Sequence, residues 1–152
     1  MRIVPLLMLV GAACWASVSR AEDAFGTWKM NAARSTFTGG TQPKSFTVRI
    51  EPHARSELFT LDRIEADGRA TSSSTILYLD GKPRDFQDFG CSGTQSSRRV
   101  DSQIVEILRK CASGEWTRFI RRLTPKSELV LEITAQQPDG RRFERRLVLE
   151  KQ

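Results

Sequence analysis

The sequence predicts an all-β protein, built as an up-and-down antiparallel meander of about 8–9 strands. Apolar and polar residues alternate with a period of two along most of the chain, and helical periodicity is nearly absent. Residues that favour tight turns separate the alternating runs. Short links of this kind pair each strand with the next, and a long meander tends to close into a barrel because closure removes its exposed edges.

The first 21 residues have the order of a secretory signal peptide. Arg2 provides the positive charge, residues 3–15 form an apolar run, and Ser19 and Ala21 are the small residues of a cleavage site. The apolar run is shorter than the roughly 20 residues that span a bilayer as a helix. We therefore expect a signal peptide over residues 1–21, and export to the periplasm or out of the cell.

An uncleaved N-terminal membrane anchor and a lipoprotein signal at Cys14 are the two alternatives to cleavage after Ala21. Cleavage leaves one predicted domain, residues 22–152, whose length suits a single modest core. Because Arg2 and Arg20 leave with the signal peptide, the net charge falls from +6 to +4. This mildly basic balance suits solubility and, together with export, argues against nucleic acid as a partner.

The first clear strand is predicted at residues 46–50, where Phe46, Val48 and Ile50 alternate with polar side chains. One helical turn is expected before it, over residues 31–35, with Asn31 as its cap. Further strands are predicted at residues 58–66, 69–79, 83–86, 95–100, 103–111, 115–123, 128–136 and 141–150.

Turn chemistry places the links between these strands. The dipeptides Asp67-Gly68 and Asp80-Gly81 are typical of two-residue hairpins, because both residue types tolerate a positive φ. Residues 86–93, with two glycines, are the expected loop. Residues 95–100 are polar on both faces, so the alternation leaves the neighbours of that strand unassigned.

The C-terminal turns also predict a register. A three-residue loop at 138–140 pairs Gln137 with Arg141, which sets Ile133 opposite Arg145. Similar loops at 125–127 and 112–114 extend the pairing to the last four strands. One face then carries the odd-numbered residues Val105, Ile107, Phe119, Leu123, Leu129, Leu131, Ile133, Ala135, Phe143, Leu147 and Leu149. The even face, with Glu132 opposite Arg146, is expected to face solvent.

Cys91 and Cys111 remain after cleavage, and in an oxidising compartment they suggest one disulfide. A hairpin that turns near Asp101-Ser102 would place Cys91 within about two residues of the position opposite Cys111, close enough for a bridge. The alternative is a pair of buried free thiols.

Arg109, Arg121 and Arg145 share the odd, apolar face. Because an isolated buried guanidinium is costly, we hypothesise a cavity that binds an anionic ligand such as a carboxylate, with Phe119 beside these arginines. Structural roles are the alternatives: stacking on Trp28, reaching a rim of the barrel, or pairing with an inward carboxylate. Asp62 and Glu65 are the carboxylates considered for that pairing.

The segment FGTWKMN at residues 25–31 resembles the G-x-W opening of lipocalin-like barrels. With the Asp-Gly hairpins and a last strand ending near Lys151-Gln152, it most resembles the small exported lipocalin-like (calycin-type) proteins of bacteria. The resemblance implies a cup-shaped barrel that holds a small apolar or amphipathic molecule. It also implies that Trp28 packs against an arginine of a late strand to close the barrel, with Arg145 the first candidate and Arg121 the second.

No catalytic constellation is evident. His53 is the only histidine, so neither a metal site nor a Ser-His-Asp triad is expected, and we expect neither an enzyme nor a bound cofactor. The leading hypothesis is an exported lipocalin-like binding protein for a small apolar or anionic amphipathic ligand. The alternative is an exported protein-interaction module, such as a protease inhibitor, with a filled barrel. A membrane-spanning barrel is disfavoured by the charged even face.

Overall fold

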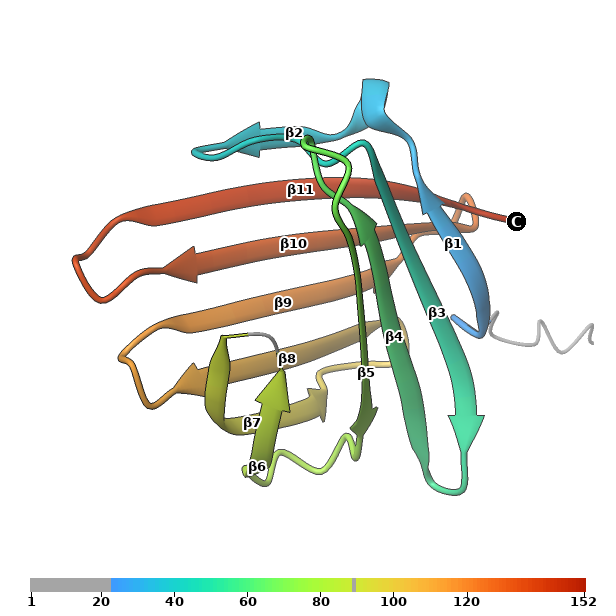
Figure 1. The fold of residues 1–152 in the computed structure, drawn as a ribbon. Coiled ribbons are helices and arrows are strands. Elements are labelled where there is room, and N and C mark those ends of the chain that lie inside the picture. The colour runs from blue at the N-terminus through green and yellow to red at the C-terminus, as the bar shows by residue number, and fades with distance from the viewer. Residues whose placement is uncertain (1–22, 89) are drawn as a thin grey trace, which may run out of the picture.

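The computed structural model of the chain describes residues 23–88 and 90–152. In this part of the chain, one antiparallel sheet of eleven strands curls into a nearly closed barrel (Figure 1). The strands are β1 (Gly26–Met30), β2 (Thr36–Thr38), β3 (Ser45–His53), β4 (Ser56–Ile64), β5 (Ala70–Leu77), β6 (Arg84–Asp88), β7 (Cys91–Arg99), β8 (Ile104–Cys111), β9 (Trp116–Leu123), β10 (Glu128–Gln136) and β11 (Arg142–Lys151). The predicted fold class is confirmed, with more strands than the 8–9 expected.

The predicted signal peptide, residues 1–21, lies outside the described residues. Among the residues that are described, no helix has the length and apolar character needed to cross a membrane.

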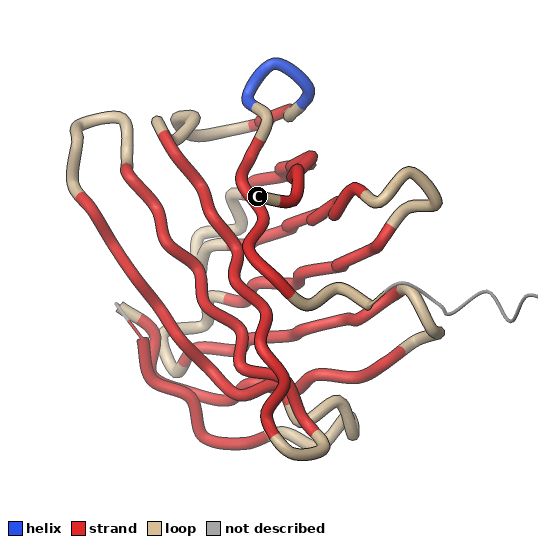
Figure 2. The backbone as a smooth tube through the Cα atoms, turned by 90° about the vertical axis from the view of Figure 1, so that its right-hand side faces the viewer, coloured by secondary structure: helices blue, strands red, loops and turns tan. Residues whose placement is uncertain are grey.

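The strand order in the sheet is β5-β4-β3-β1-β11-β10-β9-β8-β7-β6, so β1 joins the first half of the meander to the last strand. Strands β3 to β5 cross β8 to β11 at a steep angle, as Figures 1 and 2 show from two sides. Side chains of the two halves therefore meet inside the barrel, where an alternating pattern on each strand supplies one apolar face.

β1 and β2 pair with β11 one after the other, and the 3-10 turn η1 (Ala32–Arg34) interrupts them. The Arg34 amide donates to Asn31 Oδ1 at 3.3 Å, which confirms the predicted helical turn and its cap. This turn covers part of the even face, because the Asn31 amide donates to the Val148 carbonyl and the Val148 amide donates to Ser35 Oγ. Val148 and its neighbour Val130 are consequently buried, whereas the sequence predicted a wholly solvated face.

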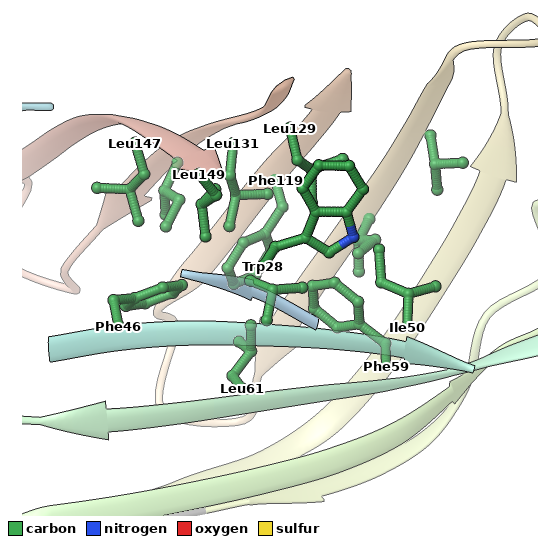
Figure 3. Close-up of a cluster of buried hydrophobic side chains, with 14 of the residues drawn as sticks. Trp28, Phe46, Ile50, Phe59, Leu61, Phe119, Leu129, Leu131, Leu147 and Leu149 are labelled. Carbon is green, nitrogen blue, oxygen red and sulfur yellow. The ribbon is translucent and has the colours of Figure 1, made fainter. Parts of the chain in front are cut away.

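The predicted register of the last four strands is confirmed. Ile133 lies opposite Arg145, Leu131 opposite Leu147 and Leu129 opposite Leu149, and Phe119 lies between Ile133 and Ile107 on the neighbouring strands. The odd residues consequently point inward and form the core with side chains of β1, β3, β4 and β5 (Figure 3). The core cluster comprises Trp28, Phe46, Val48, Ile50, Phe59, Leu61, Leu77, Val105, Ile107, Phe119, Leu123, Leu129, Leu131, Ile133, Leu147 and Leu149.

Trp28 is fully buried in this core, and its Nε1 donates to the Ala24 carbonyl at 2.8 Å. The residue opposite it on β11 is Lys151, whose Nζ lies 5.4 Å from the centre of the indole ring. The predicted pairing of Trp28 with Arg145 is wrong, because Arg145 precedes Lys151 by six residues, or about 20 Å of strand. The second candidate, Arg121, pairs instead with Glu57.

The hairpin predicted at Asp80-Gly81 is also wrong. β5 and β6 do not pair with each other and form the two edges of the sheet. We call the place where these two edges face each other the seam. Residues 78–83 cross the seam and are tied to Ser97 of β7, whose Oγ accepts from the Leu79 amide at 3.0 Å and whose carbonyl accepts from the Gly81 amide at 2.7 Å. The Asp67-Gly68 turn does form the hairpin between β4 and β5, with one more loop residue than predicted.

The expected loop at 86–93 is largely strand, because Phe86 pairs with Gly93 and Asp88 pairs with Cys91. The polar segment that the alternation left unassigned is β7, between β6 and β8. The disulfide between Cys91 and Cys111 is confirmed, with a Cα–Cα distance of 5.1 Å. Gly93 is the residue directly opposite Cys111, and Cys91 precedes Gly93 by two residues, as the hairpin geometry predicted.

Gly93 is the tightest backbone position beside this disulfide. A Cβ atom there would lie 2.0 Å from the Lys110 carbonyl oxygen and 2.9 Å from Cys111 Cα. Because both contacts are to backbone, Gly93→Ala must push β7 away from β8, and we expect it to lower the free energy of unfolding by about 1–3 kcal/mol. Urea denaturation measures the change. The neighbouring exposed variant Ser92→Ala is the control and should change stability little.

Candidate ligand-binding cavity

A cavity of about 320 Å³ lies inside the barrel, toward the end that carries the β8–β9 and β10–β11 hairpins. Its apolar lining comprises Phe46, Leu61, Phe86, Phe119, Ile133, Ala135 and Phe143. Its charged lining comprises Arg63, Arg109 and Arg145 together with Asp88 and Glu115. The volume is at the small end of the range for small-molecule sites, and the lining combines an apolar surface with a few placed charges.

Arg109, on β8, is the most buried cation of this cavity, with 9% of its surface exposed. Its Cζ lies 4.4 Å from the ring centre of Phe86 and 5.0 Å from that of Phe119, so the guanidinium is held between two aromatic rings. Its Nε donates to Gln95 Oε1 at 2.9 Å. Its Nη2 is buried and makes no hydrogen bond with any residue that the structure describes.

Burial lowers the pKa of Arg109 to about 10, a shift that Asp88 opposes and Arg63 increases. The guanidinium is therefore still a cation at neutral pH. Its positive charge is balanced only in part, because no carboxylate of the described residues lies within 4.0 Å of its nitrogens. A desolvated cation with an unused donor is the group that an anionic ligand would complement.

Gln95 fixes the orientation of Arg109. Its side chain is 7% exposed, and its Nε2 donates to Thr75 Oγ1 at 2.9 Å across the seam. Because the amide nitrogen is engaged by Thr75, its oxygen is left to accept from Arg109. This bridge was not predicted, since β7 could not be placed and the seam was unexpected.

Arg145, on β11, also lines the cavity. Its Cζ lies 6.0 Å from the ring centre of Phe37. Burial, and after it the positive charge of Arg63, lowers the pKa of Arg145, while Glu65 opposes the shift. Arg63, on β4, was not among the predicted site residues because the face assignment covered only the last four strands.

Arg121 does not line the cavity, contrary to the prediction that it binds ligand. Its Nη1 lies 2.6 Å from Glu57 Oε2, and the two residues are 3% and 4% exposed. Arg99 Nη2 reaches the other carboxylate oxygen at 3.2 Å. The pairing partners considered from the sequence were wrong, because Asp62 accepts from Ser72 and Glu65 pairs with Arg63. Continuing the alternation back from Phe59 by two residues would have identified Glu57 as inward.

The described residues thus form a nearly closed antiparallel up-and-down barrel with a cavity that is partly apolar and partly charged. A zebrafish ileal bile acid-binding protein, solved in complex with cholic acid, is similar over 84% of this chain and 98% of its own, with a TM-score of 0.51. The two sequences are 13% identical, so the likeness shows the fold alone. No protein-family model matches the chain, and no curated protein matches its sequence.

Proposed function

We propose that this barrel binds a small amphipathic anion, with the anionic group on Arg109 and the apolar part against Phe119 and the neighbouring aromatic rings. The observation that carries the proposal is the buried guanidinium of Arg109, which lines the cavity and whose Nη2 has no hydrogen-bond partner in the described structure. The similar zebrafish protein, whose complex contains cholic acid, supports a ligand of this kind.

Energetics favour a binding role for Arg109 over a purely structural one. An apolar side chain of similar volume would fill the space between Phe86 and Phe119 without desolvating a charge. A carboxylate, sulfonate or phosphate ester would accept a charge-assisted hydrogen bond from the guanidinium and offset the cost of burial. We propose binding and not catalysis, because the group placed against the ligand, Arg109, keeps its proton near neutral pH and does not exchange it with a ligand.

We also propose that the protein is exported, with residues 1–21 as its signal peptide. The disulfide between Cys91 and Cys111 supports an oxidising compartment. The alternative function, a protein-interaction module with a filled barrel, is less favoured because the barrel contains a cavity.

The binding proposal is tested with 1-anilinonaphthalene-8-sulfonate, a fluorescent probe with an apolar body and one sulfonate. Arg109→Met removes the charge and keeps a similar volume. We expect it to weaken probe affinity by about 2 kcal/mol or more, roughly 30-fold, because a buried charge contact is lost. The free energy of unfolding should stay constant or rise, since an unpaired buried cation is removed.

The matched control is Arg122→Met, which changes an exposed arginine on the outer face of β9 and should leave probe affinity within about twofold. Equal probe affinity in the wild type and Arg109→Met would contradict the proposal. So would a large loss of stability in Arg109→Met, which would make that arginine structural.

A further inference from the structure

We propose that the cavity contains a second anion-binding subsite, formed by Arg145 and Arg63, so that its preferred ligand is an amphipath with an anionic group at each end. The inference rests on the proposed function, in which the first anionic group binds Arg109. It deepens that function by naming the class of ligand, namely small dianions with an apolar middle.

Arg145 differs from the other arginines of the described chain in its surroundings. Ten of them form ion pairs with a carboxylate within 4.0 Å: Arg34, Arg49, Arg63, Arg84, Arg98, Arg99, Arg118, Arg121, Arg141 and Arg142. Four more are exposed to water and need no partner: Arg55, Arg69, Arg122 and Arg146. Arg109 and Arg145 are the two that are at least partly buried, line the cavity and form no ion pair with a described residue.

Arg63 adds a second cation beside Arg145. Its Nε lies 3.5 Å from Glu65 Oε1 and 3.4 Å from Thr71 Oγ1. Both contacts use Nε, so within the described residues the two terminal nitrogens of Arg63 make no hydrogen bond. Those nitrogens and the whole guanidinium of Arg145 are the unused donors of this part of the cavity wall. Glu65 pairs with Arg63 and also acts on Arg145, so these two cations share one nearby carboxylate. The local excess of positive charge is what a second anion would neutralise.

The two subsites start from strands that are not neighbours. β8 and β11 are divided by β9 and β10, so the backbones of Arg109 and Arg145 lie about 14 Å apart along the curved sheet. The positive charge of Arg63 lowers the pKa of both arginines, so Arg63 lies near each of them. Arg109 is held by Phe86, Phe119 and Gln95, so its guanidinium is not free to swing toward Arg145. Phe119 and Ile133 line the cavity wall between them and would contact the apolar middle of a ligand.

The test compares α,ω-dicarboxylates of eight to fourteen carbons with monocarboxylates of the same length, each measured by displacement of the anilinonaphthalene sulfonate probe. Without a second subsite a diacid should bind more weakly than its monoacid, because burying an unpaired carboxylate is costly. With it, we expect the best diacid to bind about tenfold or more tightly than the matched monoacid, from added charge-assisted hydrogen bonds.

Arg145→Gln should abolish this preference, raising the diacid Kd about tenfold and leaving the monoacid Kd within about twofold. Arg63→Gln should act in the same direction with a smaller effect, and the outward neighbour Arg146→Gln is the control.

One contradicting outcome can be seen in the wild type alone. If the wild type binds the monoacid more tightly than the diacid, the inference is overturned and the proposed function still stands. Equal weakening of both acids in Arg145→Gln would overturn it too, because one anion would then bridge all three arginines. Failure of either acid to displace the probe would overturn the proposed function itself.

Discussion

Glu57→Ala is expected to lower the free energy of unfolding by about 3–5 kcal/mol, because it leaves Arg121 as a buried cation without a counter-charge. Arg121 is 3% exposed and its Nη1 lies 2.6 Å from the Glu57 carboxylate. Glu57 also forms an ion pair with Arg99. Its two ion pairs therefore join β4 to β7 and to β9. Urea denaturation followed by tryptophan fluorescence measures the change.

Two further variants show whether the loss comes from the unpaired charge. Glu57→Leu combined with Arg121→Met should recover most of the stability, because apolar side chains of similar volume replace both charges. Glu144→Ala is the surface control: its pair with Arg142 is 3.9 Å long and exposed, and its removal should cost less than about 1 kcal/mol. If the double variant were as unstable as Glu57→Ala, the loss would come from packing and not from the charge.

The double variant Cys91→Ala/Cys111→Ala is expected to lower the free energy of unfolding by about 3 kcal/mol. The disulfide closes a loop of 20 residues and so reduces the conformational entropy of the unfolded chain, which the variant regains. The effect is measured as the difference in the free energy of unfolding between the oxidised wild type and the variant. Dithiothreitol should bring the wild type to the stability of the variant and leave the variant unchanged. A variant as stable as the oxidised wild type would show that strand pairing alone holds β7 on β8.

The part of the barrel that could be predicted from the sequence is the part whose strands are joined by recognisable turns. Three-residue loops at 112–114, 125–127 and 138–140 determine the register of β8 to β11, and from the register follow the inward residues and the displaced disulfide. Each of these turns joins strands that are neighbours in the sequence. The information that specifies the pairing is therefore contained within a few residues.

Features that depend on distant pairing were missed. β2 has three residues and pairs with β11, more than a hundred residues later, so no local turn marks it. The Asp80-Gly81 pair has the composition of a hairpin turn, yet β5 and β6 are held apart by the connection that crosses to Ser97. Alternation assigned Arg145 to the correct face, but the family resemblance matched it to Trp28. Lys151 lies opposite Trp28 instead, and Phe37 lies opposite Arg145.

The cavity itself was not predictable from the alternation, because inward apolar residues serve equally in a filled core and in a hollow one. Arg109 and Phe119 were correctly placed on the inner face. The stacking of Arg109 on Phe86 could not be predicted without the position of β6, which pairs only with β7. Arg63 was missed because the face assignment stopped at the last four strands, although alternation from Phe59 and Leu61 on β4 leads to it.

The seam leaves this barrel with two strand edges, and exposed edges can recruit strands from other molecules into amyloid-like aggregates. Both edges have features that discourage such recruitment. β5 has a run of serines and threonines in its middle, and β6 has only five residues, three of them charged. The connection tied to Ser97 occupies part of the space where a foreign strand would pair. An incompletely closed barrel can in this way remain dispersed at high concentration, because its unpaired strands are polar, short and partly covered.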